Sequence, residues 1–169
     1  MTDPSHRDVM DLLSRVPGFE RSTEGQLATL AEHLRIEEVT GRTFITEGEP
    51  SQAVYFLLEG QVEVICAAPD GDKVVVGVLD PPAILGFAGL LSERSRVASV
   101  RARGHVRVLC LPGAVARELL LRDDEVSAVM RRGLLIALAS QLARANQLLA
   151  RLSASVLARE GHQPPTLVV

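Results

Sequence analysis

The residues whose types and spacing suggest binding chemistry lie between positions 84 and 100. Gly86 and Gly89 bracket a short apolar turn, and Arg96 follows at the start of an alternating, strand-like run. Glycines let the backbone bend closely around a ligand, and the N–H groups of a first helical turn attract an anion. A guanidinium from the next strand would add matching charge and a planar set of donors. The pattern predicts a small phosphate-binding cradle; the alternative is an ordinary loop with a solvated arginine.

The composition argues against several other kinds of site. The net charge is −3 and aromatic residues make up 3% of the 169 residues, so the chain has neither the basic charge nor the stacking side chains of a nucleic-acid surface. Cys66 and Cys110 stand alone in apolar runs, and the four histidines lack metal-ligand spacing, so we expect two buried, reduced thiols and no metal. No nucleophile–base constellation is visible, so we expect no catalytic residues, no enzyme activity and no cofactor.

The elements that must position the cradle begin with two short helices. Apolar spacing predicts one helix over residues 6–16 and a second after Thr23, which stands in capping-box relation to Gln26. From residue 35 the apolar period becomes two, and turn residues separate the runs. The strand candidates are residues 36–39, 43–46, 54–58, 61–67, 73–79, 97–102 and 106–111. This pattern predicts an α+β fold built on an antiparallel, jelly-roll-like β-roll of about eight strands.

Two helices are expected to close the chain. Pro112 suits the first position of a helix to about residue 122, and Asp123 and Asp124 suit the cap of a long helix over 124–160. A heptad seam on this helix predicts a coiled-coil homodimer, and the alternative is a helix folded back on its own roll. The expected dimer contacts are Leu135, Leu138, Leu142, Leu149 and Leu152. We therefore expect a domain over residues 1–123, the helix over 124–160 and a flexible tail over 161–169.

This order of elements, together with several short motifs, resembles the cyclic nucleotide-binding domain family over about residues 9–125. The motifs are Leu12-Leu13, Val16-Pro17-Gly18-Phe19, Gly41, Ile45-x-Glu47-Gly48-Glu49-Pro50, the run Tyr55 to Val64 and the stretch Gly86 to Val100. The resemblance implies a cassette, residues 86–99, that holds the cyclic phosphate of cAMP or cGMP. It also implies that backbone N–H groups and one arginine make the phosphate contacts, while a glutamate holds the ribose hydroxyl.

The family's site residues transfer to this chain only in part. Gly86 fits the first cassette glycine and Arg96 fits the phosphate arginine, but Phe87 stands where the family has its ribose-binding glutamate. Val97 stands where many members carry Thr or Ser. The ligand-binding residues implied are Gly86, Phe87, Ala88, Gly89, Leu90, Arg96, Val97 and Ala98.

The consequence of Phe87 is open at this stage. A charge-assisted hydrogen bond is worth roughly 1.5–3 kcal/mol, so its loss would weaken binding by about one to two decades. A phenylalanine ring could instead occupy the ribose volume and close the pocket, or the pocket could suit a different anion.

The expected function is a stand-alone sensor domain that couples a phosphate-containing ligand, cAMP or cGMP, to the position of the C-terminal helix. The alternative is a degenerate, nucleotide-free scaffold for dimerisation and protein interaction; a third reading is a regulatory subunit whose effector is a separate chain. We expect an unknown protein effector and no direct DNA binding, because no winged helix-turn-helix follows the long helix before Val169. Without a signal peptide or an uninterrupted apolar run of about 18 residues, we expect a cytoplasmic protein with no membrane contact.

Overall fold

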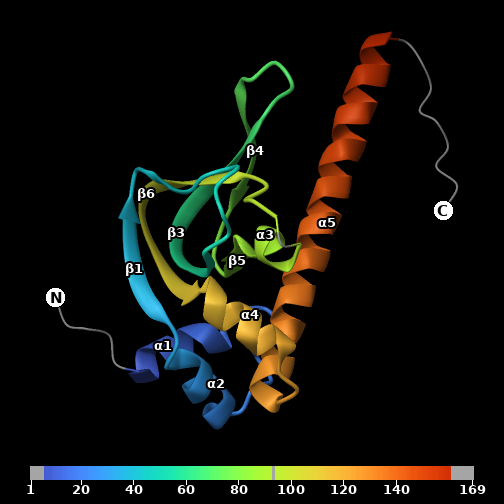
Figure 1. The fold of residues 1–169 in the computed structure, drawn as a ribbon. Coiled ribbons are helices and arrows are strands. Elements are labelled where there is room, and N and C mark those ends of the chain that lie inside the picture. The colour runs from blue at the N-terminus through green and yellow to red at the C-terminus, as the bar shows by residue number, and fades with distance from the viewer. Residues whose placement is uncertain (1–5, 93, 161–169) are drawn as a thin grey trace, which may run out of the picture.

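The computed structural model describes residues 6–92 and 94–160, so the expected tail at 161–169 lies outside the described residues (Figure 1). Two leading helices precede a sheet, a short helix interrupts the late strands, and two helices follow. Their bounds are α1 His6–Ser14, α2 Glu24–Ala31, β1 Arg35–Thr40, β2 Thr43–Ile45, β3 Ala53–Ala67, β4 Lys73–Leu79, β5 Ala83–Leu85, α3 Phe87–Leu91, β6 Ser99–Pro112, α4 Gly113–Leu121 and α5 Glu125–Glu160.

The described strands form one antiparallel sheet of six strands. Its order is β1-β6-β3-β4, with β2 also pairing with β6 and β5 with β3. The long strands β3 and β6 bend around the core, and α1, α2 and α4 gather with the start of α5 at one end of the roll (Figure 1). The prediction of an antiparallel β-roll between leading helices and a long final helix is confirmed.

The expected number of strands was too high because two glycine turns lie inside strands. Residues 54–58 and 61–67 belong to the single strand β3, and residues 106–111 join β6, where residues 97 and 98 are not strand. Gly60 has a φ of +80°, and a side chain there would collide with the carbonyl oxygen of His105. The pairing of β3 with β6 shifts register on both sides of Glu59, so this glycine bends a continuous strand instead of ending it.

The helices at the end of the roll close the main apolar core. Thr23 and Gln26 form the predicted capping box, which fixes the start of α2. Leu13, Phe19 and Leu30 are fully or almost fully buried. The rings of Phe19 and Phe56 meet edge to face at 5.7 Å, which joins the helical end to strand β3.

The first third of α5 is anchored in this core. Asp124 caps the helix, since its side chain accepts a hydrogen bond from the backbone N–H of Ser127 at 2.8 Å. Gly133 lies so close to the ring of Phe19 that no larger residue would fit, and Arg132 donates to the carbonyl of Gly18 at 2.7 Å. These contacts fix the direction in which the rest of the helix leaves the body.

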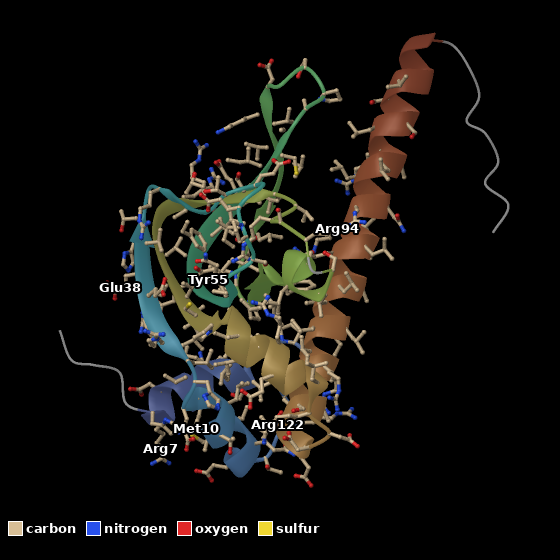
Figure 2. The ribbon with its side chains drawn as sticks, in the orientation of Figure 1. Arg7, Met10, Glu38, Tyr55, Arg94 and Arg122 are labelled. Atoms are coloured by element: carbon tan, nitrogen blue, oxygen red, sulfur yellow. The ribbon has the colours of Figure 1, made fainter. Side chains whose placement is uncertain are left out.

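The remainder of α5 runs along the roll and then past it, as its free side chains show (Figure 2). From residue 142 to residue 156 every position is exposed. Within Glu125–Val156 an 18-residue window has a mean hydropathy of 1.3, so by length and composition alone this helix could cross a membrane. The domain buries 28% of that window.

Candidate functional site

A cavity of about 370 Å³ lies between the sheet, the cassette and α5. Its volume falls in the range of about 300–1,000 Å³ that is usual for small-molecule sites. The residues around it are Ile45, Val64, Val76, Gly77, Val78, Leu79, Leu85, Gly86, Phe87, Ala88, Gly89, Arg96, Val97, Ala98, Val100, Gln141, Arg144, Ala145 and Leu148. The structure therefore gathers seven of the eight expected ligand-binding residues around one space.

Leu90 is the expected site residue that does not line the cavity. It is 2% exposed and packs in the main apolar core. On a helix, residues three apart share a face, so Leu90 follows Phe87 into the core. Val97, in contrast, lies at the cavity with an exposed side chain.

The cassette bends into the cavity at Gly86. This residue precedes α3 with a φ of +75°, a conformation that glycine adopts without strain. The guanidinium of Arg96 packs directly against it, so a side chain at this position would strike the arginine. Gly86 and Arg96 are therefore in direct contact in the cassette.

Arg96 is buried, and it holds two backbone segments together. Its guanidinium donates to the carbonyl of Gly86 and, at 2.8 Å, to the carbonyl of Ala53 at the start of β3. Its own backbone N–H donates to the carbonyl of Glu49 at 2.8 Å. Arg96 forms no ion pair within the described part of the chain. A guanidinium carries five N–H donors, so donors remain for an anion in the cavity.

Burial also changes the electrostatics of Arg96. Loss of water lowers the pKa of the guanidinium, and the nearby Tyr55, Cys110 and Glu49 act in the opposite direction. Arginine starts from a pKa far above neutral, so the group stays charged. The cavity therefore has a fixed positive charge in one wall.

Phe87 forms a wall of the cavity without filling it. Its side chain is 1% exposed and belongs to the main core, together with Phe56 and Leu90. The space beside the cassette exists with this ring in place. Of the three possibilities considered for Phe87, the space beside the ring argues against closure of the pocket.

The wall that α5 contributes to the cavity was not predicted from the sequence. Gln141, Arg144, Ala145 and Leu148 line the cavity, and the side-chain amide of Gln141 donates to the carbonyl of Ile84 at 3.4 Å. Their helical spacing was visible in the sequence, but the heptad seam beside it drew the interpretation toward dimerisation. The seam and the cavity wall are neighbouring faces of the same helix.

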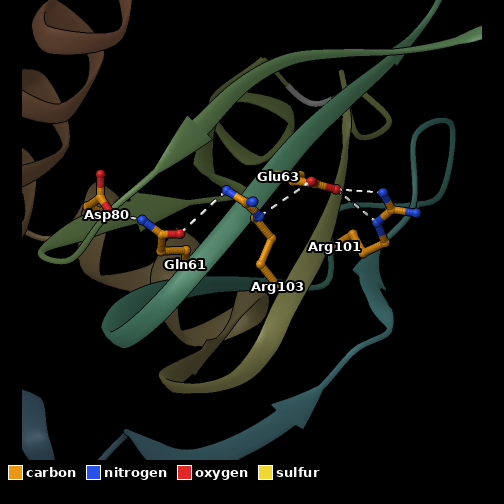
Figure 3. Close-up of polar contacts among 5 residues, drawn as sticks. All are labelled: Gln61, Glu63, Asp80, Arg101 and Arg103. Atoms are coloured by element: carbon orange, nitrogen blue, oxygen red, sulfur yellow. Dashed lines mark hydrogen bonds and ion pairs between the residues drawn. The ribbon is translucent and has the colours of Figure 1, made fainter.

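Other arginines near the cassette belong to a separate polar network. Arg101 donates to Glu63 on β3 at 2.6 and 3.0 Å, and Arg103 lies 3.6 Å from the same carboxylate (Figure 3). Successive residues of a strand face opposite sides, and Val64 and Val100 line the cavity. The paired arginines therefore lie on the other face of the sheet.

Comparison with known proteins gives a consistent result. The family model for the cyclic nucleotide-binding domain matches residues 39–123, half of the chain. A protein named as a potassium channel protein, from Rhodopseudomonas palustris, is 30% identical over 118 residues, which are 69% of this chain and 28% of that protein. The CRP-like cAMP-activated global transcriptional regulator of Mycobacterium tuberculosis is 27% identical over 143 residues, which are 84% of this chain and 62% of the regulator. The chain thus spans less than two thirds of these curated relatives.

A solved structure shares the fold over nearly the whole chain. A cyclic nucleotide-binding domain from Methylobacillus flagellatus superposes with a TM-score of 0.76 at 16% identity. The match covers 96% of this chain and 86% of that one, so it extends across the roll and its helices.

Proposed function

The chain belongs to the cyclic nucleotide-binding domain family, which is a family of regulatory domains, and we propose that a phosphate-containing ligand in the cassette of residues 86–99 controls the position of α5. The observation that carries this proposal is the cavity itself, because one space is walled by the cassette, by Arg96 and by the middle of α5. A ligand that contacts both the roll and the helix changes the relative stability of helix positions.

The proposed ligand is cAMP or cGMP. The spacing from Gly86 to Arg96 follows the family cassette, and a curated relative is named as cAMP-activated. The buried charge of Arg96 suits a phosphate. Because Phe87 replaces the ribose-binding glutamate, we expect weaker binding, in the range of tens to hundreds of micromolar, where a micromolar site has lost roughly one to two decades of affinity.

The exposed seam of α5 supports a proposed homodimer. The exposed fractions of its five expected contact residues lie between 45% and 65%; they are Leu135, Leu138, Leu142, Leu149 and Leu152. These five side chains are exposed in the single chain, and an apolar stripe with heptad spacing suits a second copy of the same helix. We propose that α5 joins two copies while its adjacent face senses the ligand.

The alternative of a nucleotide-free scaffold keeps one observation in its favour. Arg96 is already held by two backbone carbonyls, so part of its role is structural without any ligand. In either case the proposed partner is a protein effector in the cytoplasm. The net charge of −3 does not favour DNA.

Isothermal titration calorimetry with cAMP and cGMP tests the ligand. We expect saturable heat with the wild-type protein and its loss in Arg96→Gln at a temperature where circular dichroism shows that variant folded. Arg94→Gln is the matched control, because Arg94 is exposed and does not line the cavity. Absence of heat at millimolar nucleotide, with folded protein, would overturn the cyclic nucleotide proposal.

A further inference from the structure

We propose that the cavity between the sheet and α5 accepts an organic anion with an apolar body, held by Arg96 from the roll and by Arg144 from α5. This inference rests on the proposed function for the place of the ligand, and it goes beyond it by naming the body of the ligand and a second charged contact. The chemistry of the cavity walls carries both parts.

The walls of the cavity are mainly aliphatic. Its apolar side chains come from five strands and include Ile45, Val64, Val76, Val78, Leu85 and Val100, with Leu148 added by α5. The polar side chains in the described lining are those of Arg96, Gln141 and Arg144, and no carboxylate is among them. A ligand enclosed here meets hydrocarbon over most of its surface and positive charge at two places.

Such walls disfavour a sugar and favour hydrocarbon. A hydroxyl that enters an apolar wall without a partner weakens binding by about a decade or more. The position from which the family holds the ribose is occupied by Phe87, a buried ring. The arginines can only donate, and Gln141, whose amide N–H bonds the carbonyl of Ile84, is the one side chain of the described lining with an oxygen that could accept from a hydroxyl. An apolar body, in contrast, gains affinity as it leaves water.

The two arginines at the cavity have no ion-pair partner among the side chains that the structure describes. Along α5, Arg131 approaches Asp123 and donates to the carbonyl of Arg122, and Arg132 donates to Gly18. Neither Arg96 nor Arg144 takes part in an ion pair within residues 6–92 and 94–160. Acidic side chains outnumber basic ones in the whole chain, 21 to 18. A shortage of carboxylates in the sequence therefore does not explain why two arginines and no described carboxylate line this cavity. Apolar surroundings strengthen the attraction of both charges for an anion.

Because Arg144 lies on α5, an anion that contacts it and Arg96 would connect the helix to the roll. Arg96 is tied to the roll through Gly86 and Ala53, whereas Arg144 moves with α5. Gln141, about one turn earlier, already connects the helix to β5 at Ile84. An anion that meets both guanidiniums therefore adds a second tie between the helix and the sheet.

The test is calorimetry of the intact protein with sodium octanoate, and with octylammonium as a ligand of equal chain length and opposite charge. We expect octanoate to bind and octylammonium to give no saturable heat. Arg144→Gln should weaken octanoate binding about fivefold, as expected for one partly exposed charge pair. Arg151→Gln is the matched control, because Arg151 lies two turns further along the same helix, outside the cavity lining, and it should leave the affinity unchanged.

The outcomes separate this inference from the cyclic nucleotide proposal when cAMP is titrated in the same series. Octanoate binding that depends on Arg144, without cAMP binding, supports the apolar anion and contradicts the proposal that cAMP is the ligand. cAMP binding without octanoate binding overturns the apolar anion and keeps the proposed function. Equal binding of octanoate and octylammonium overturns the inference, because it would show that exposed valines and leucines bind any eight-carbon alkyl group. An unchanged octanoate affinity in Arg144→Gln overturns it as well. No binding of either ligand overturns both.

Discussion

Arg96 combines a structural and a binding role at the residue scale. The same guanidinium that lines the cavity also ties the cassette to β3 through the carbonyls of Gly86 and Ala53. Hydrogen bonds from a charged group to buried carbonyls are stronger than neutral ones, and their loss leaves the acceptors unpaired. The site is therefore preorganised by the residue that is proposed to meet the anion.

The structural role of Arg96 predicts that its substitution destabilises the protein even when no ligand is bound. Arg96→Gln should lower the free energy of unfolding by about 1–3 kcal/mol, because two charge-assisted hydrogen bonds are lost. Urea denaturation measures the change, with Arg94→Gln as a control that should stay within about 0.5 kcal/mol. Equal stability of the two variants would contradict the bridging role.

Phe87 is a core residue that also forms a wall of the site. Phe87→Ala should lower the free energy of unfolding by roughly 3–5 kcal/mol, as for other buried phenylalanines. Val97→Ala, at a cavity position that is 61% exposed, should change it by less than about 0.5 kcal/mol. Thermal or urea unfolding compares the variants. A nearly neutral Phe87→Ala would show that the ring packs loosely and can leave the core.

The free thiols differ in their surroundings. Cys110 is buried as expected, whereas Cys66 is partly exposed, which corrects the expectation of two buried thiols. Burial and the nearby Glu37 raise the pKa of Cys110 from 9.0 to about 11. The folded state thus holds the thiol proton more tightly than the unfolded state, and this contribution to stability is complete below pH 9.

Stability should therefore fall as the pH rises between pH 9 and about 11. The pKa of Tyr55 is also raised by burial, so the wild-type decline has more than one source. The contribution of Cys110 is isolated by Cys110→Ala, whose free energy of unfolding should decline less steeply with pH. Parallel curves for the two proteins in urea titrations at increasing pH would contradict the assignment.

At the element scale, α5 presents two faces with different surroundings, for which we propose different tasks. Gln141 faces the cavity, and Leu142, the next residue, is rotated by about 100° and is 61% exposed. A ligand on one face and a partner on the other thus act on the same stretch of helix. This arrangement connects the proposed sensing to the proposed dimer without a further element.

The dimer has its own prediction. Leu142→Asp combined with Leu149→Asp should change the mass measured by multi-angle light scattering from dimer to monomer, because both residues would carry charge into the seam. The thermal unfolding temperature of the roll should stay unchanged, since neither side chain packs in its core. Gln147→Asp with Ala154→Asp adds the same charge outside the heptad seam and should stay dimeric. An unchanged mass in the seam variant, or a monomeric wild type, would refute the coiled coil.

The sequence predicted those features that depend on local chemistry. The Thr23–Gln26 capping box and the short turn after Gly86 follow from residue types at fixed spacing. The predicted number of strands was too high partly because Gly60 was read as the end of a strand. A glycine that ends a strand and a glycine that bends one look alike in the sequence until the partner strand is known. The α5 wall was missed for a similar reason, since its path depends on the close contact of Gly133 with Phe19.

At the scale of the whole molecule, the domain consists of a fixed body and a helix that leaves it. The start of α5 is locked at Phe19 and Gly18, its middle borders the cavity, and its end stands free of the roll (Figure 1). The start is held by core packing, so the proposed ligand would act on the middle of the helix. The central claim is that an anion contacts the cassette and α5 at once.

Nuclear magnetic resonance of the ¹⁵N-labelled protein tests this claim most directly. Titration with cAMP, cGMP and octanoate should shift backbone amide signals of residues 86–91 and 96–98 together with residues 141–148 of α5. The signals of α1 and α2, at the far end of the roll, should stay in place. Shifts limited to the cassette would contradict the coupling to α5, and a spectrum unchanged at millimolar concentrations of all three would contradict the account as a whole.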